Sequence, residues 1–131
     1  MSIHVFRVIV PVSDIERGAR FYGELLGFEG ERIAPERHYF NCGGTILALV
    51  HPAGHDRPFR PNPDHVYFAV DDLEAYFARA MHAGCSELES EISKRVWGER
   101  SFYGRDPFGN PICFVDETTK YTGGPWGGAS A

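Results

Sequence analysis

The chain has 131 residues and a formal net charge of −5, and 43% of its residues are hydrophobic and 14% aromatic. This length fits one domain, or two half-size modules sharing a core, and needs no disulfide staples. The acidic balance argues against nucleic acid and against an anionic membrane surface as partners. No signal-peptide pattern or membrane-length apolar run is visible. The three widely spaced cysteines argue against a disulfide framework, so we expect a cytoplasmic protein.

The first half of the chain predicts a strand followed by a helix. Residues 3–12 are rich in β-branched and aromatic side chains, which suit a half-buried strand, and Pro11 marks its end or an edge position. Ser13 and Glu16 form a capping box, which is typical of a helix start. Gly27 is the expected helix end. The apolar face of this helix is predicted to comprise Ile15, Ala19, Tyr22 and Leu26.

Three strands and a connector are predicted next. The strands are residues 28–33, 38–42 and 45–50, with a tight hairpin at Gly43-Gly44 between the last two. The stretch 51–64 contains four prolines, which exclude both a helix and a central strand.

The second half repeats this order. Asp71 or Asp72 is expected to cap a helix that ends at Gly84. Its apolar face is predicted to comprise Leu73, Tyr76, Phe77, Ala80 and Met81. Strands are predicted at residues 65–70, 88–92, 100–106 and 111–116, with a turn at 107–110. From Thr122 the chain reads as a flexible tail, which docks through Trp126 or not at all.

The two halves also correspond in detail, because Val12–Glu16 recurs as Val70–Glu74. A repeat of about half the chain indicates two copies of one supersecondary unit. We therefore predict an α+β fold of two tandem βαβββ modules, whose curved mixed sheet has a concave ligand cup. The predicted boundaries are 1–51 for the first module, 52–64 for the connector, 65–117 for the second module and 118–131 for the tail.

Several motifs resemble those of the vicinal oxygen chelate superfamily, which includes glyoxalase I, extradiol dioxygenases, and fosfomycin- and bleomycin-resistance proteins. The motifs are Pro11–Asp14, Phe21-Tyr22, Leu26–Phe28, His65–Asp72 and Arg105–Val115. The bleomycin-resistance branch is the most similar, since Trp97–Arg100 shortly precedes Asp106–Asn110. The resemblance implies a homodimer with a ligand cup. Pro11 resembles the hinge at which related dimers exchange their N-terminal strand.

The resemblance also implies four metal-ligand positions, which fall on Arg7, Ala48, His65 and Cys113. The family pattern requires His or Glu there, and only His65 conforms. His4, His38 and Glu99 are other conceivable donors, but no spacing supports them. His4 in particular lies an odd number of residues before Arg7, and so on the opposite strand face. We therefore expect no cofactor and no metal ligands, with a bound divalent metal as the alternative.

Each candidate site residue has a functional and a structural interpretation. Arg7 would bind an anionic or carbonyl group of a ligand, or else pair with a nearby carboxylate at the dimer surface. His65 would act as a general base or bond a ligand, or else bond to backbone. Cys113 would pack in the core, or act as a nucleophile with His65. Trp97 and Phe102, with Tyr39 or Phe40, would line the cup or fill the core.

These observations leave three functions open. The first is a metal-free protein that binds a small aromatic or cationic molecule in a cleft at a homodimer interface. The acidic charge favours a cationic ligand over an anionic one. The second is a metal-dependent lyase, isomerase or dioxygenase with an atypical ligand set. The third is a metal-free enzyme that uses His65, alone or with Cys113, as acid or base.

Overall fold

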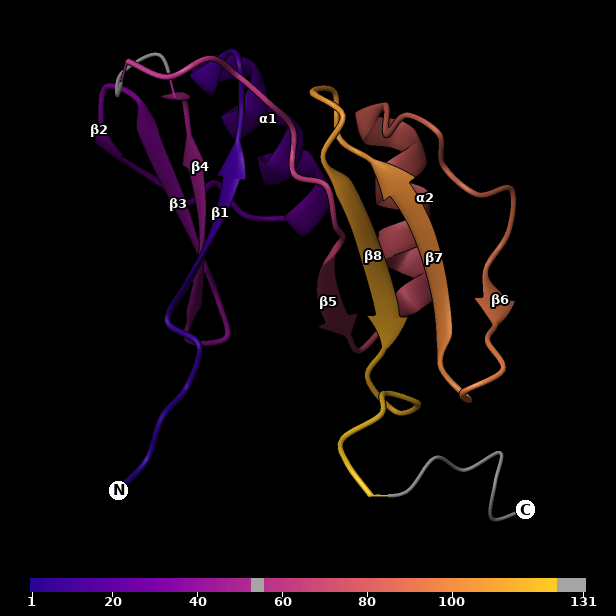
Figure 1. The fold of residues 1–131 in the computed structure, drawn as a ribbon. Coiled ribbons are helices and arrows are strands. Elements are labelled where there is room, and N and C mark those ends of the chain that lie inside the picture. Colours follow the sequence, from indigo (N-terminus) through magenta and orange to yellow (C-terminus); the bar gives the residue numbers. More distant parts are fainter. Residues whose placement is uncertain (53–55, 125–131) are drawn as a thin grey trace.

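A computed structural model describes residues 1–52 and 56–124, which form two βαβββ modules (Figure 1). The first module contains β1 (Arg7–Pro11), α1 (Ile15–Leu26), β2 (Glu31–Ala34), β3 (Arg37–Cys42) and β4 (Thr45–Val50). The second contains β5 (Val66–Val70), α2 (Leu73–Ala83), β6 (Ser93–Lys94), β7 (Arg100–Arg105) and β8 (Pro111–Asp116). The predicted α+β class with tandem βαβββ modules is confirmed.

The two sheets have the same strand order, which is the structural counterpart of the sequence repeat. The order is β1-β4-β3-β2 in the first sheet and β5-β8-β7-β6 in the second. In each, the first strand pairs in parallel with the last, and the remaining pairs are antiparallel. The sheets lie next to each other with β1 and β5 at their adjoining edges (Figure 1).

Aspartates begin both helices. Asp14, rather than the predicted Ser13, caps α1, and its side chain accepts a hydrogen bond of 3.0 Å from the Arg17 amide. The capping-box prediction is therefore wrong, because Glu16 points away to bond Arg32. Asp72 caps α2 in the same way. Both helices end as predicted, at glycines in the left-handed conformation.

Three predicted strands differ from the observed ones. The strand predicted from residue 3 begins only at Arg7, and the one predicted at 28–33 lies at Glu31–Ala34. No ladder forms over 88–92, and the edge strand is β6 instead. There the backbone makes single contacts with β7, such as the 3.0 Å bond from the Glu89 amide to the Tyr103 carbonyl. The Glu89 side chain also bonds the Tyr103 amide, which holds this segment without strand pairing.

The core of the second module is built around Phe114. Its ring stacks on Phe68 and on Phe102, with centroids 4.8 and 5.2 Å apart, and Tyr76 of α2 adds a third stacked ring. Of the residues predicted for the apolar face of α2, Leu73 and Ala80 are buried, and Tyr76 and Phe77 pack partly buried against the core. Met81 lies outside the core, with 57% of its surface exposed.

A buried polar network joins the two modules. Asp106, fully buried in the turn between β7 and β8, accepts hydrogen bonds from the Tyr22 hydroxyl of α1 at 2.6 Å and from the Asn110 side chain at 2.8 Å. Asn110 also donates to the carbonyl of Pro11. Tyr22 and Pro11 belong to the first module, and the other two residues belong to the second. The network therefore fixes how the modules dock.

Within 1–52 and 56–124, no helix has the length and apolar character that crossing a membrane would take. Trp126 lies outside the described residues.

Candidate small-molecule site

Each sheet has one face covered by its helix and one face without a helix, which we call the open face. Side chains alternate between the two faces along a strand. On β1, Val10 is buried beneath α1, whereas Arg7 and Ile9 are exposed on the open face. On β5, Val66 and Phe68 pack into the core, whereas His65 and Tyr67 are exposed.

The open face of the first sheet carries a guanidinium among apolar side chains. Arg7 lies with its Cζ atom 4.9 Å from the ring centroid of Phe6 and 5.1 Å from that of Tyr39. Ile9, Ala48 and Tyr39 are aligned across the three adjacent strands β1, β4 and β3. No carboxylate of the described residues pairs with Arg7 within the chain, and pairing with a carboxylate at a dimer surface stays a prediction.

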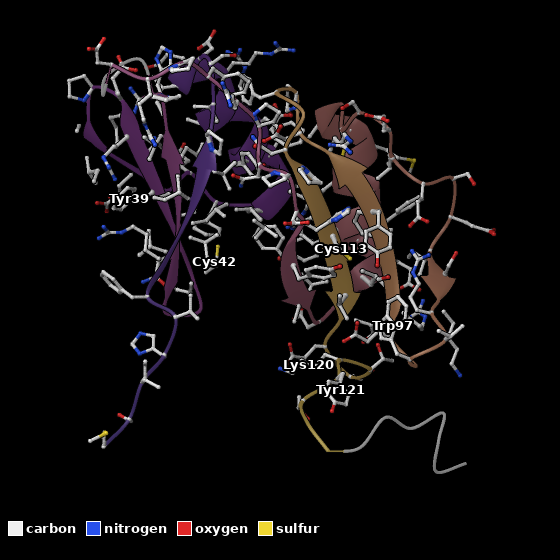
Figure 2. All side chains as sticks on the ribbon, viewed as in Figure 1. Tyr39, Cys42, Trp97, Cys113, Lys120 and Tyr121 are labelled. Carbon is white, nitrogen blue, oxygen red and sulfur yellow. The ribbon has the colours of Figure 1, made fainter. Side chains whose placement is uncertain are left out.

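The equivalent row on the second sheet is Tyr67, Cys113 and Tyr103, across β5, β8 and β7. The His65 ring packs against both tyrosines, with centroids 4.9 Å from Tyr103 and 5.9 Å from Tyr67. These three rings make an aromatic platform, in which 57% of the Tyr67 surface is exposed. Figure 2 shows Cys113 on this sheet and Tyr39 on the first.

Arg95 is a polar group of this face that sequence reasoning missed. Its guanidinium lies 4.5 Å from the Tyr103 ring centroid, and its Nε atom donates to the Ser101 hydroxyl at 2.8 Å. Nη2 pairs with the Glu89 carboxylate and also donates to the Ser101 carbonyl. Arg95 lies in the irregular segment before β7, where no periodicity assigns a side chain to a face. Tyr67 and Tyr103 were detectable, because they alternate with the core residues Phe68 and Phe102.

Cys113, the middle residue of this row, is buried and is not exposed as a nucleophile would be. Burial raises the pKa of its thiol to about 12, against the opposing effects of the Ser101 hydroxyl and the Arg95 charge. Burial likewise raises the pKa of the Tyr103 phenol to about 12, and the neighbouring Tyr67 adds to the rise. Both groups are therefore neutral near pH 7, which favours the packing interpretation of Cys113.

Phe40 and Phe102 do not lie where the cup prediction placed them. They are 0% and 1% exposed, and they belong to the core on the helix-covered faces of their sheets. The register explains this, because each is one residue away from an open-face position. Trp97 lies between β6 and β7, is 46% exposed, and donates through Nε1 to Glu99 at 2.7 Å.

The four expected metal-ligand positions do not make a metal site. Arg7 offers no lone pair, Ala48 offers a methyl group, and Cys113 is a buried thiol where the family pattern requires His or Glu, so His65 is the one position that conforms. The other conceivable donors do not help, since the His38 ring bonds the Glu29 carbonyl and Arg32. In the part of the chain that the structure describes, no three His, Cys, Asp or Glu side chains gather in a metal-binding group.

A cleft of about 790 Å³ lies where the two modules adjoin. Residues of β1 and β4, such as Val8 and Leu47, form one wall, and β5 forms the other. Tyr67 and Ala69 of the open face contribute to its lining, and Lys120 and Glu117 supply charges. Of the three platform rings, Tyr67 thus borders a concave space of ligand size.

Three known proteins illustrate what the chain is similar to. It is 28% identical over 102 residues to metallothiol transferase FosB of Shouchella clausii (strain KSM-K16), and this alignment covers 76% of this chain and 70% of that protein. It is 28% identical over 123 residues to mitochondrial methylmalonyl-CoA epimerase of Bos taurus, covering 82% of this chain and 63% of that protein. A solved glyoxalase-related enzyme from Fulvimarina pelagi has the same fold, with a TM-score of 0.75, 22% identity and 92% of each chain covered.

The family assignment comes from a broader match. The family model for the Glyoxalase/Bleomycin resistance protein/Dioxygenase superfamily matches residues 4–114, which cover the first module and all of the second except the end of β8. The repeat, the strand order of the two sheets and this match agree. The chain belongs to the glyoxalase/bleomycin resistance protein/dioxygenase superfamily, the group of vicinal oxygen chelate proteins.

Proposed function

We propose that this protein binds a small, planar aromatic molecule against its open faces without a metal ion. One observation carries the proposal. Around His65, which is one of the four positions where the family pattern requires a metal ligand, Tyr67 and Tyr103 form an aromatic platform, and His65 and Tyr67 are exposed. Aromatic rings stack or meet edge to face with a flat ligand, and each such contact adds to the area buried.

A cationic aromatic ligand is the alternative within the same proposal, because the chain carries a net charge of −5. A metal-dependent enzyme is less well supported, although one relative is named a metallothiol transferase. His65 supplies a single donor, and a metal site needs three or four. The expectation of a cytoplasmic protein stays a prediction.

A thermal-shift screen with planar aromatic compounds, run in the presence of a chelator, tests this function. We expect compounds that raise the melting temperature of the wild type, and a lost shift in Tyr67→Ala. Met81→Ala is the matched control, because it also removes a 57% exposed apolar side chain, but from the outer side of α2. A shift that appears only when a divalent metal is added would contradict the proposal.

We further propose that two copies of the chain complete each site. In a single chain, the open faces leave Ile9 of β1 41% exposed and Tyr67 of β5 57% exposed, and both residues lie on the edge strands where the two sheets adjoin. Each site would then combine the first module of one copy with the second module of the other. β1 pairs with β4 of its own chain in this structure, and exchange of the N-terminal strand remains a prediction.

Mixing two variants distinguishes shared sites from sites within one chain. Tyr39→Ala damages the open face of the first module and Tyr67→Ala that of the second. If sites form between copies, a mixed dimer contains one intact site, and ligand binding partly returns after the two variants are unfolded together and refolded. If binding stays absent in the mixture while light scattering shows dimers, sites shared between copies are ruled out.

A further inference from the structure

Contacts with three residues hold the Arg95 guanidinium in one position on the open face of the second sheet. Nε and Nη2 are both occupied, by Ser101 and Glu89, and the planar group lies over the Tyr103 ring. Only 16% of the Arg95 side chain is exposed. Such a side chain has few rotamers left to lose when it binds a ligand, which favours recognition.

One part of this guanidinium is still available. Nη1 donates to none of the described residues. Among those same residues, every fully buried side-chain nitrogen or oxygen has a partner, so Nη1 keeps some accessible surface. Nη1 carries N–H donors and no acceptor, and it would therefore donate a hydrogen bond to an oxygen atom of a ligand.

The charge around Arg95 indicates which kind of oxygen fits. Glu89 already neutralises the guanidinium through Nη2, and Glu99 lies near the same face, where its charge acts on Cys113. A carboxylate ligand would meet these two acidic side chains, whereas a neutral carbonyl oxygen accepts the hydrogen bond without that repulsion.

We propose that Arg95 is a specificity residue, which selects aromatic ligands that carry a neutral carbonyl group. The aryl ring would lie against Tyr67 and His65, and the carbonyl oxygen would accept from Nη1 of Arg95. Tyr103 contacts both the imidazole and the guanidinium, so the two halves of the site adjoin. This inference rests on the proposed aromatic binding function and adds the chemical class of the ligand.

Calorimetric titration with three naphthalene probes tests the inference. The probes are 1-acetonaphthone, the nearly isosteric 1-ethylnaphthalene, which lacks the oxygen, and 1-naphthoate. We expect the wild type to bind the ketone about tenfold more tightly than the hydrocarbon, as one hydrogen bond to a charged donor would provide. The carboxylate should bind more weakly than the ketone.

The variant Glu89→Gln/Arg95→Met removes the guanidinium without leaving a carboxylate unpaired. It should bind the ketone and the hydrocarbon equally, because the donor that distinguishes them is gone. Glu16→Gln/Arg32→Met removes an ion pair of the first module with the same zero change in net charge, and it should keep the preference.

Other outcomes separate this inference from the function on which it rests. If the wild type binds both neutral probes equally, or if the double variant loses affinity for both to the same extent, Arg95 has no selective role and the inference is overturned. Tighter binding of the carboxylate than of the ketone would overturn it as well. If none of the probes binds to the wild type, the proposed aromatic binding function fails together with the inference.

Discussion

The two modules share one topology but differ in what their equivalent positions carry. The central open-face row is Ile9, Ala48 and Tyr39 in the first module, and Tyr67, Cys113 and Tyr103 in the second. The first is mainly apolar, with Arg7 beside it, and Arg7 pairs with no carboxylate of the described residues. The second is aromatic, with the Arg95 guanidinium anchored above it. The duplicated fold thus carries different side chains at equivalent positions of its two copies.

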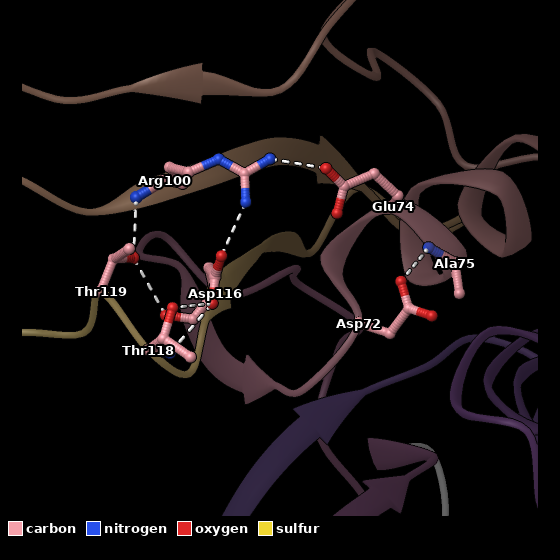
Figure 3. A network of polar contacts seen from close by, with 7 residues as sticks. All are labelled: Asp72, Glu74, Ala75, Arg100, Asp116, Thr118 and Thr119. Atoms are coloured by element: carbon pink, nitrogen blue, oxygen red, sulfur yellow. Dashed lines mark hydrogen bonds and ion pairs between the residues drawn. The ribbon is translucent and has the colours of Figure 1, made fainter.

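Their turns and helix starts differ in a similar way. The turn from β3 to β4 faces solvent, whereas the equivalent turn from β7 to β8 is buried at the junction of the modules. Glu16 and Glu74 occupy the same place in the repeat, yet Glu16 pairs with Arg32 of β2 and Glu74 with Arg100 of β7. Arg100 also bonds Asp116 at the end of β8 (Figure 3).

The largest expected effect concerns the two cores. Phe114 and Leu49 are equivalent positions on the last strand of each module, and both are fully buried. Phe114→Ala should lower the free energy of unfolding by about 4 kcal/mol and Leu49→Ala by about 3 kcal/mol, because the phenylalanine loses three stacked rings. Urea denaturation measures both. A larger loss for Leu49→Ala would contradict the central role of the aromatic stack.

The two turns should respond very differently to substitution. Asp106→Ala leaves the Tyr22 hydroxyl and the Asn110 side chain without their buried acceptor, which should cost about 3 kcal/mol of unfolding free energy. Asn41→Ala, near the end of β3, removes one exposed hydrogen bond from the Gly44 amide of the turn and should cost only about 0.5 kcal/mol. Equal losses in chemical denaturation would show that the buried network does not hold the modules together.

The cysteines of the two modules should differ in how fast they react with a thiol reagent. Burial raises the pKa of Cys113 to about 12 and of Cys85 to about 11, and it raises the pKa of the half-buried Cys42 as well. At pH 8 we expect a thiol reagent to modify Cys42 of the first module first. Cys113 should react only on the timescale of unfolding, because its sulfur is inaccessible. Mass spectrometry of partly labelled protein would identify the order, and early labelling of Cys113 would refute its burial.

The smallest effect is on the pH dependence of stability. Hydrogen bonding to Arg32 lowers the pKa of Glu16, and hydrogen bonding to Arg100 lowers that of Glu74. Such a carboxylate stabilises the fold above its ordinary pKa of 4.5, and the contribution is lost as the pH falls through the lowered value. The urea midpoint should therefore fall between pH 5 and pH 3. Arg100→Met should reduce this fall more than Arg32→Met, since Arg100 faces two carboxylates.

The sequence predicted the repeat, the fold class and most elements, because local periodicity and glycine positions determine these. The strand predicted at residues 88–92 did not form, since side-chain bonds from Glu89 to β7 hold that segment instead. Phe40 and Phe102 were assigned to the cup as aromatic residues, but strand parity places them in the core. Applying the period of two to each strand would have identified Tyr67 and Tyr103 instead.

Arg95 was beyond prediction for a different reason. It lies in an irregular segment, and it reaches the open face only through contacts with Glu89, Ser101 and Tyr103. These partners lie before and after Arg95 in the sequence, and the irregular backbone between them follows neither a helix nor a strand period. Tertiary contacts of this kind leave no local pattern in one sequence.

The central claim is that the family site works in this chain without a metal ion, and the metal content of the purified protein tests it most directly. Elemental analysis by mass spectrometry, after gel filtration without chelator, should find no stoichiometric divalent ion, because His65 is the single suitable donor at the four family positions. One tightly held ion per chain, lost in His65→Ala with the fold intact by circular dichroism, would contradict the account.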